Sequence, residues 1–511
     1  MNADAAGVAS SVAHDHDRDL LDNVRPHDWV NPEPRDRYDL VVVGAGTAGL
    51  VSAAIGAGLG ARVALVERDR MGGDCLNVGC VPSKGLLRAS RSWAEAHSSH
   101  ERFGGPLARG DEDYATAVGR MREIRAAISD VDAAERFRSL GIDVFLGEAR
   151  FDSDRSVSVD GHRLPFRRAV LATGARAMVP PIAGLETIDF LTNETVFDLD
   201  EVPERMLVLG AGAIGCELAQ AFARFGSSVV LLDMEEHVLP REEPDAARVV
   251  QRAMERDGVE FLGRTKVVEA SSGEGGGKRV LVESEGGRRT LEGDEVLLAL
   301  GRTPNLDLDL DAAGIAFGRR GVEVDARLRT TNPRVYAVGD VASPFQFTHA
   351  ADAQARLAVR NALFFGRGKS TELTIPWATY TSPELARVGL SEAEAADKGV
   401  EIETVTIDFA DVDRARLDGD EDGFVRIHLE AGKDRIVGAT VVHPHGGELI
   451  GQISQLMTLG VGLDSLSDVV FPYPTIAESL RKAADARRRS RLTERVSWAF
   501  NQYFRLWRRL T

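Results

Sequence analysis

Apolar runs joined by glycine-rich turns mark two places where the chain predicts a strand, a tight turn and a helix. In the first, the strand Leu40–Val43 is followed by an Ala-rich helix and by a second strand at Arg62–Val66. In the second, a strand begins at Met206 and the chain returns to a strand at Val229–Leu232. Because strand–helix–strand units build parallel sheets, we predict two α/β domains.

The rest of the pattern divides into shorter segments. Residues 84–135 have helical periodicity, whereas residues 141–172 are typical of short strands. Ser271–Gly277 is rich in serine and glycine and predicts a flexible hairpin loop. Strands and helices alternate again from Ile375 to about residue 485. The polar, acidic residues 1–36 predict a mobile arm.

Composition and charge exclude several classes of protein. The 511 residues suffice for about three to four domains, each with its own core. A net charge of −17 argues against nucleic acid as the partner of the whole chain. The charge-free stretch Leu40–Ala61 holds six glycines and predicts a strand and a buried helix rather than a membrane span. Three cysteines and the lack of a secretion signal in the first 36 residues favour a reducing, cytoplasmic location.

Both glycine-rich turns carry the pattern G-x-G-x-x-G, and an acidic residue ends the following strand 23 positions after the first glycine. The two sets are Gly44, Gly46 and Gly49 with Glu67, and Gly210, Gly212 and Gly215 with Asp233. The first glycine permits the turn, the second lets backbone approach a pyrophosphate, and the third lets helix and strand pack; the carboxylate binds a ribose. One copy alone is compatible with a simple tight turn. Two copies in this context predict two bound dinucleotides.

Asp233 bears on which nicotinamide cofactor binds. A carboxylate repels the 2′-phosphate of NADPH, which arginines would attract. The following residues 234–237 add two glutamates and no arginine. We therefore expect NADH, with NADPH less favoured; the alternative is that Asp233 only caps a loop and the preference lies elsewhere.

The cysteine pair Cys75 and Cys80 lies in the segment 72–84. Along a regular helix five residues span roughly 7.5 Å, beyond the roughly 6.8 Å limit for the Cα atoms of a disulfide, so a bond requires a bend, for which Asn77 and Gly79 are suited. No other Cys or His is close enough in sequence to complete a zinc site, and we expect no metal site. A redox-active pair beside a flavin is the preferred interpretation. Lys84 is placed to lower the pKa of a neighbouring thiol, with an ordinary surface lysine as the alternative.

Together these motifs resemble the flavoprotein disulfide reductases, the class I pyridine nucleotide–disulfide oxidoreductases, over about residues 38–485. The family includes dihydrolipoyl dehydrogenase, glutathione reductase and mercuric reductase. Further matching segments are Ala172-Thr173-Gly174, Ala299–Asn305, Val335–Asp340, Tyr380–Glu384 and Val388–Glu392.

The resemblance implies the fold. We expect an α/β chain with two Rossmann-like dinucleotide-binding domains, for FAD and for NAD(P), and a C-terminal α+β dimerisation domain, which makes the protein a homodimer. The expected segments are the arm (1–36), the FAD-binding domain (37–175 and 299–370), the NAD(P)-binding domain (176–298), the dimerisation domain (371–485) and a basic amphipathic tail helix (486–511).

The resemblance also implies the roles of site residues. Besides the first fingerprint, the expected FAD-binding and domain-crossing residues are Thr173, Gly174, Arg302, Gly339 and Asp340. Cys80 is expected beside the flavin and Cys75 toward the acceptor, with Lys84 paired to Glu217. Electrons would then pass from NADH through FAD and a Cys75–Cys80 disulfide to a small acceptor. Cys216 is expected to be a buried thiol without a role.

One departure from the family concerns its C-terminal catalytic motif. Members acting on thiols use His-Pro-Thr-x-x-Glu, whose histidine is a general base, whereas this chain has Tyr473 at the histidine position and keeps Glu478. A phenol with a pKa of about 10 is a poor base beside an imidazole of about 6.5. We expect Tyr473 and Glu478 to complete the partner's site, and His443 and His445 to be structural.

Mercuric reductases carry tyrosine in a context similar to Phe471-Pro472-Tyr473, but they also use a C-terminal cysteine pair, and this chain has no cysteine after Cys216. We therefore expect a mercuric reductase-like enzyme without the delivery thiols, whose acceptor is a metal ion, a quinone or a dye-like oxidant. The alternatives are a dihydrolipoyl dehydrogenase-type disulfide reductase, a membrane-peripheral NADH:quinone reductase and a low-turnover interaction protein.

The C-terminal segment differs in charge from the rest. Residues 481–511 hold ten basic side chains against two acidic ones. Apolar residues at helical spacing predict an amphipathic helix, namely Leu492, Val496, Ala499, Phe500, Tyr503, Trp507 and Leu510. Such a helix fits peripheral contact of residues 487–511 with an anionic membrane, or packing on its own dimer or a partner; both remain open.

Overall fold

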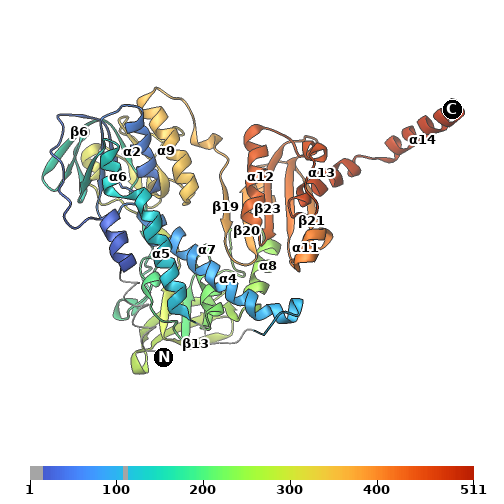
Figure 1. Cartoon of the computed structure of the whole chain (residues 1–511), viewed down its shortest axis with the longest axis horizontal. Helices are drawn as coiled ribbons and strands as arrows, with labels where there is room; N and C mark the ends of the chain where they lie inside the picture. The colour runs from blue at the N-terminus through green and yellow to red at the C-terminus, as the bar shows by residue number, and fades with distance from the viewer. Residues whose placement is uncertain (1–14, 108–112, 511) are drawn as a thin grey trace. The chain divides into compact units, whose positions relative to one another are not determined.

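The structure, a computed structural model, describes residues 15–107 and 113–510. The chain divides into two compact units. The first runs to Val238 and resumes over Met254–Leu373; the second combines Leu239–Ala253 with the chain from Thr374 onward. Figure 1 gives the order of the elements along the chain, and both units contain helices and sheets, as predicted.

A mainly parallel sheet forms the centre of the first dinucleotide-binding region. Strands β3, β2, β1 and β6 follow one another in the sheet, and β18 pairs with β6. Their bounds are β1 (Tyr38–Val43), β2 (Val63–Glu67), β3 (Asp143–Leu146), β6 (His162–Leu171) and β18 (Val335–Ala337). The start of β6 also pairs antiparallel with β5 (Ser156–Val159), which pairs with β4 (Ala149–Ser153). The strands β1 and β2 are almost wholly apolar because both faces of the sheet are covered.

Helices of this region carry the glycine-rich turn and the cysteine segment. The helix α2 (Thr47–Gly58) lies beside α9 (Thr348–Leu363), as Figure 1 shows. The others are α3 (Gly73–Asn77), α4 (Cys80–Phe103), α5 (Tyr114–Asp132) and α6 (Ala134–Ser139). The helices predicted within residues 84–135 and the strands predicted within residues 141–172 are thus confirmed. No helix among the described residues is long and apolar enough to cross a membrane.

A second parallel sheet forms the other dinucleotide-binding region, in the order β10, β9, β8 and β14. Its elements are β8 (Arg205–Leu209), α7 (Ala213–Arg224), β9 (Ser228–Leu232), β10 (Val259–Leu262) and β14 (Glu295–Leu298). The helix α8 (Pro244–Arg256) lies between β9 and β10 in the chain, but its residues up to Ala253 belong to the second unit. An antiparallel sheet of β11 (Lys266–Ser272), β12 (Lys278–Ser284) and β13 (Gly287–Gly293) is inserted before β14. The loop predicted at Ser271–Gly277 is confirmed as the hairpin between β11 and β12 over residues 273–277, whereas Ser271 and Ser272 belong to β11. Two short pairs, β7 (Ala175–Ala177) with β15 (Arg302–Pro304) and β16 (Phe317–Gly318) with β17 (Gly321–Val322), complete the unit.

The arm predicted for residues 1–36 is packed over its described part. Residues 15–24 are helical, and Leu20 and Val24 are buried in the core around β1. The Asn31 side chain donates to the Leu146 carbonyl at 3.0 Å and accepts from its N–H at 2.8 Å. A mobile arm is therefore wrong for residues 15–36, because apolar side chains among the acidic ones anchor it; residues 1–14 lie outside the described part.

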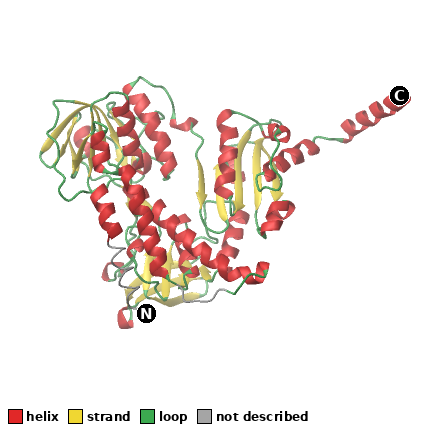
Figure 2. Ribbon diagram, in the orientation of Figure 1, coloured by secondary structure: helices red, strands yellow, loops and turns green. Residues whose placement is uncertain are grey.

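The second unit is built on an antiparallel sheet in the order β19, β20, β23, β22 and β21. The strands are β19 (Pro376–Thr379), β20 (Glu384–Gly389), β21 (Ile402–Asp408), β22 (Phe424–Glu430) and β23 (Ile436–His443). The helices are α10 (Glu392–Asp397), α11 (Asp413–Asp418), α12 (Gly446–Leu459), α13 (Glu478–Ser490) and α14 (Glu494–Leu510). Figure 2 shows the α12 helix lying along this sheet, with which it shares an apolar core. This is the α+β domain that we expected.

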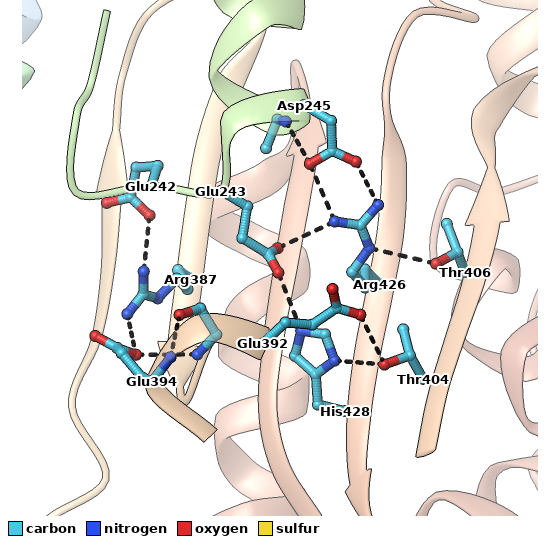
Figure 3. Close-up of polar contacts among 12 residues, drawn as sticks. Glu242, Glu243, Asp245, Arg387, Glu392, Glu394, Thr404, Thr406, Arg426 and His428 are labelled. Carbon is cyan, nitrogen blue, oxygen red and sulfur yellow. Dashed lines mark hydrogen bonds and ion pairs between the residues drawn. The ribbon is translucent and has the colours of Figure 1, made fainter. Parts of the chain in front are cut away.

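A buried polar network joins residues 239–253, expected in the NAD(P) domain, to this sheet (Figure 3). Glu243 contacts His428 Nε2 at 3.3 Å and Arg426 at 3.4 Å, and Asp245 binds Arg426 at 2.5 Å. Although burial raises the pKa of Glu243, the hydrogen bond from His428 and the charge of Arg426 hold it at about 2. The start of α8 is thereby fixed to β22.

The predicted tail helix over residues 486–511 is wrong in its boundary, because two helices occupy this part of the chain. Arg487 is buried in α13, where its guanidinium contacts Asp434 at 2.5 Å and Asp464 at 2.8 Å. The ion pairs keep α13 on the sheet to Ser490, and Leu492 lies in the turn before α14.

Candidate active site

Cys75 and Cys80 are brought together by a bend between two helices. Cys75 lies in α3, which ends at Asn77, and Cys80 is the first residue of α4. The Asn77 side chain donates to the carbonyls of Met71 and Gly73, and a Cβ on Gly79 would lie 2.7 Å from the Asp74 carbonyl oxygen. The bend at Asn77 and Gly79 that a Cys75–Cys80 contact requires is therefore present.

Cys75 and Cys80 are free cysteines, and their interaction moves their pKa values in opposite directions. The hydrogen bond from Cys75 lowers the pKa of Cys80, burial opposes this, and a hydrogen bond from Thr348 and the charge of Lys84 lower it further, to about 6. The hydrogen bond to Cys80 and burial raise the pKa of Cys75. Cys80 is thus the thiolate of the pair at neutral pH, and the exposed member.

Thr348 is a site residue that the sequence reasoning missed. Its Oγ1 lies 3.2 Å from Cys80 Sγ, although 268 positions separate the two residues. Thr348 begins α9, so this contact arises from the packing of α9 in the first unit. The only feature of the sequence that could have indicated Thr348 is its position a few residues after the family-like segment that ends at Asp340.

Lys84 and Glu217 form the ion pair expected from the family resemblance. Lys84 Nζ on α4 lies 2.7 Å from Glu217 Oε2 on α7, and the glutamate is buried. Lys84 is one helical turn beyond Cys80, so the pair lies alongside the thiolate. Its ammonium charge stabilises that thiolate, whereas the Glu217 carboxylate opposes it.

Arg302 connects the cysteine segment to the predicted FAD segment around Asp340. Its guanidinium binds Asp74, the neighbour of Cys75, and lies 3.3 Å from Asp340. Burial raises the pKa of Asp340, and Arg302 opposes that rise. The Thr173 hydroxyl donates to the carbonyl of Asn305 at 2.9 Å. The predicted residues Thr173, Gly174, Arg302, Gly339 and Asp340 therefore come from segments that meet in the first unit.

The two G-x-G-x-x-G turns repeat the same steric requirements. Gly44 and Gly210 have φ of +98° and +105°, and a Cβ there would lie 2.4 Å and 2.5 Å from carbonyl oxygens of Ala172 and Ala299. A Cβ on Gly49 or Gly215 would meet the carbonyl of the first glycine at less than 2 Å. Packing within the chain therefore explains the first and third glycine of both copies.

Packing within the chain does not explain the second glycine, and this observation tests the fit to a dinucleotide. A Cβ on Gly46 would meet only Gly73 Cα at 3.8 Å, and a Cβ on Gly212 would meet nothing within 4 Å. Both residues have ordinary negative φ of −74° and −73° and lie just before the N-termini of α2 and α7. A glycine that the chain does not need is accounted for by close approach of a pyrophosphate to the backbone. The residues present therefore fit FAD at the first turn and NAD(P) at the second.

The acidic residues Glu67 and Asp233 make matching contacts. Glu67 accepts from the Ala45 N–H at 2.6 Å, and Asp233 from the Ala211 N–H at 2.6 Å. Each carboxylate thus fixes the glycine-rich turn of its own strand–helix–strand unit by this hydrogen bond. It retains lone pairs on the same oxygens for a ribose hydroxyl.

A basic residue beside Asp233 was also missed. Arg264 follows β10, and its N–H donates to the Glu235 carbonyl at 2.9 Å. Its guanidinium lies 2.8 Å from Glu236 and 3.5 Å from Glu285. The parallel pairing of β9 with β10 brings it there. The loop after Asp233 thus has an arginine within reach, paired to acidic side chains.

Tyr473 and Glu478 both belong to the second unit; Glu478 begins α13, and Tyr473 lies five residues before it. Tyr473 is 69% exposed, and its hydroxyl donates to Asp413 at 3.1 Å. The hydrogen bond to Asp413 and its negative charge raise the pKa of Tyr473, so the phenolate that could act as a base is even less populated at neutral pH than in a free phenol. Glu478 is buried and accepts from Arg481 at 2.5 Å.

The remaining cysteine and the C-terminal histidines lie in packed surroundings. Cys216 Sγ donates to the Ala211 carbonyl at 3.2 Å in the interior of α7. His443 is buried against the Phe409 ring, and burial lowers its pKa to about 3. The His443 ring is therefore neutral at physiological pH. Among residues 15–107 and 113–510, no group of three or more Cys, His, Asp or Glu side chains is arranged to hold a metal ion.

Comparisons with known proteins agree with this arrangement. Residues 38–355 match the family described as pyridine nucleotide-disulphide oxidoreductase, and residues 375–484 match the dimerisation domain of that family.

Individual relatives cover most of the chain. A mercuric reductase of Bacillus cereus is 34% identical over 457 residues, which make up 89% of this chain and 72% of that protein. A dihydrolipoyl dehydrogenase of Thermus scotoductus is 33% identical over 459 residues, or 88% and 97% of the two chains. Among solved structures, the HOCl-induced flavoprotein disulfide reductase RclA from Escherichia coli superposes with a TM-score of 0.76 at 30% identity, covering 88% of this chain and 99% of that one.

Proposed function

Because the chain belongs to the pyridine nucleotide-disulphide oxidoreductase family, we propose that it carries electrons from NADH through FAD and the Cys75–Cys80 pair to a thiophilic metal ion such as Hg(II). Membership makes it an NAD(P)H-dependent flavoprotein oxidoreductase that binds FAD and a pyridine nucleotide. The choice of NADH and of the acceptor is the proposal.

The observation that supports this acceptor is the setting of the Cys80 thiol beside Cys75, Thr348 and the charge of Lys84, which all lower its pKa and favour the thiolate. Cysteine sulfur is a soft ligand, and two cysteines five positions apart, one of them a thiolate, suit a soft metal ion. Reduction of such an acceptor requires no proton transfer by a general acid or base. Tyr473, held to Asp413, does not provide the base that a dihydrolipoyl or glutathione substrate requires.

Some of the site residues bind the cofactors, and others stabilise the charge of the Cys80 thiolate. Gly46 and Gly212 leave room for the two pyrophosphates, and Glu67 and Asp233 meet the riboses. Bound FAD supplies the hydride and electron transfer chemistry. Lys84 and Thr348 keep Cys80 as the thiolate, and Cys75 is its dithiol partner. In the net reaction NADH loses two electrons and Hg(II) gains two, giving NAD⁺, a proton and Hg(0).

We also propose a homodimer, since the chain carries the family's dimerisation domain, in which Tyr473 and Glu478 complete the partner's site. A cytoplasmic location, expected from the cysteine content, stays a prediction.

An acceptor screen tests the proposal. The purified holoenzyme is given NADH and, separately, Hg(II), Cu(II), lipoamide, glutathione disulfide and a quinone. We expect NADH oxidation with a metal ion to exceed that with either disulfide, and to be lost in Cys80→Ser. Faster turnover with lipoamide would instead identify a dihydrolipoyl dehydrogenase-type enzyme, and faster turnover with the quinone in both wild type and Cys80→Ser would show that the cysteine pair is not on the path.

A further inference from the structure

The last helix, α14 (Glu494–Leu510), separates its apolar and charged side chains onto two faces. At about 100° per residue, eight apolar side chains fall in one continuous arc of about 160°. They are Val496, Ala499, Phe500, Tyr503, Phe504, Leu506, Trp507 and Leu510. The opposite arc holds all four arginines of the helix, Arg495, Arg505, Arg508 and Arg509, and one apolar side chain, Trp498.

The apolar arc is open to solvent. No residue of α14 is buried by the described chain, and Phe500, Trp507 and Leu510 are 53%, 52% and 77% exposed. An exposed apolar face of this size, rimmed by charge, marks an interaction site rather than a surface adapted to water. Ring contacts along it, between Tyr503 and Phe504 and between Phe504 and Trp507, keep the aromatic side chains together.

We propose that α14 lies flat on an anionic lipid surface, with its apolar arc among the acyl chains and its arginines at the phosphates. The helix has four arginines and a single acidic residue, Glu494. This glutamate lies at the N-terminal end, where the helix dipole stabilises a negative charge. Arginines are spread over the whole polar face, which matches the diffuse negative potential of a lipid headgroup layer.

The width of the apolar face favours lipid over a second copy of the chain. A helix that packs on one partner helix buries a narrow stripe of two positions in seven, whereas eight of the seventeen positions of α14 lie in the apolar arc. The helix is about 25 Å long, enough for in-plane contact over its whole length.

The helix before it acts as the anchor to the protein. In α13, Arg487 is buried against Asp434 and Asp464, and Arg488 binds Asp468 at 3.0 Å. These arginines are committed to ion pairs within the second unit. The lipid-binding segment therefore begins at Glu494, and the short turn at 491–493 links it to a fixed helix.

The test uses the full-length holoenzyme in co-sedimentation with vesicles of phosphatidylcholine alone or mixed with phosphatidylglycerol. We expect binding to the mixed vesicles, little to phosphatidylcholine alone, and loss of binding in a chain ending at Thr493, which keeps α13 intact. Phe500→Glu should abolish binding, whereas Asn501→Glu, with the same charge change on the polar face, should only weaken it. Arg508→Gln with Arg509→Gln should lower the partition coefficient about fivefold for each arginine removed.

Three results would overturn the proposal. The first is no binding of the full chain to anionic vesicles, and the second is equal binding by the chain that ends at Thr493. The third is a change of oligomeric state on truncation, seen by light scattering without lipid binding; this would make the face an interface between copies. NADH oxidation by the truncated chain checks that the enzyme is intact.

Discussion

The Lys84 ammonium on α4 and the Glu217 carboxylate on α7 are 2.7 Å apart, and they act on the Cys80 thiol with opposite signs. The lysine lowers the pKa of Cys80 and the glutamate raises it. The two helices thus set the fraction of Cys80 thiolate through the balance of one ion pair, in which only the glutamate is buried.

Substitutions in this pair should therefore move Cys80 in opposite directions. Lys84→Met should raise its pKa above about 6, and Glu217→Gln should lower it. In reduced enzyme carrying Cys75→Ser, the iodoacetamide rate at pH 6 should fall about threefold to tenfold in the first case and rise in the second. FAD content serves as the folding control, and shifts of the same sign in both variants would contradict this account.

Thr348 should act on the same thiol through its hydroxyl alone. Thr348→Val removes the hydrogen bond at 3.2 Å and should raise the pKa of Cys80, whereas Thr348→Ser should leave it near 6. The pKa of Cys80 is measured from the pH dependence of the long-wavelength charge-transfer band that we expect between the Cys80 thiolate and bound FAD in the reduced holoenzyme. Equal profiles for the valine and serine variants would show that the hydroxyl has no effect.

Tyr473 should be the residue that excludes thiol substrates. Tyr473→His introduces an imidazole at the family's base position while Glu478 is retained, and should increase lipoamide turnover by about tenfold or more. Tyr473→Phe is the control, since it removes the bond to Asp413 without adding a base. Turnover with Hg(II) should change little in either variant. If lipoamide turnover does not rise in Tyr473→His, the side chain at position 473 does not act as a base at the partner's site in the dimer.

Glu236 should help to set the nicotinamide preference by occupying Arg264. In Glu236→Gln the guanidinium loses the nearer of its two charged partners, at 2.8 Å, keeps only Glu285 at 3.5 Å, and becomes more available to a 2′-phosphate. The ratio of kcat/KM for NADPH to that for NADH should rise about tenfold. Glu235→Gln, one residue away and outside the ion pair, should not change the ratio, and an equal rise in both variants would indicate a general charge effect.

Glu243 should stabilise the second unit at neutral pH and lose that effect in acid. Its pKa falls from 4.5 to about 2, so the stabilisation is complete above pH 4.5 and disappears as the pH drops toward 2. Glu243→Gln should lower the free energy of unfolding by about 2 kcal/mol at pH 7, with a difference that shrinks below pH 4.5. Urea unfolding at several pH values measures this, with Glu372→Gln at an exposed pair as the control. A difference that does not depend on pH would contradict it.

The sequence alone determined the local elements and the chemistry that depends on neighbours in the chain. Periodicity located β1, α2, β8 and α7, because apolar spacing reports which face of an element is buried. The glycine patterns and the Cys75–Cys80 spacing identified the two turns and the bend, since backbone conformation there depends on only a few adjacent residues.

Only the tertiary structure decided which distant side chains meet. Thr348 reaches Cys80, and Arg264 reaches Glu236, because helices and strands far apart in sequence pack side by side; no local pattern carries that information. The same holds for Arg487, whose buried ion pairs move the start of the free tail helix to Glu494. For the N-terminal segment, Leu20 and Val24 outweigh the acidic residues around them, because burial of a few apolar side chains is enough to hold a short helix that composition alone marks as mobile.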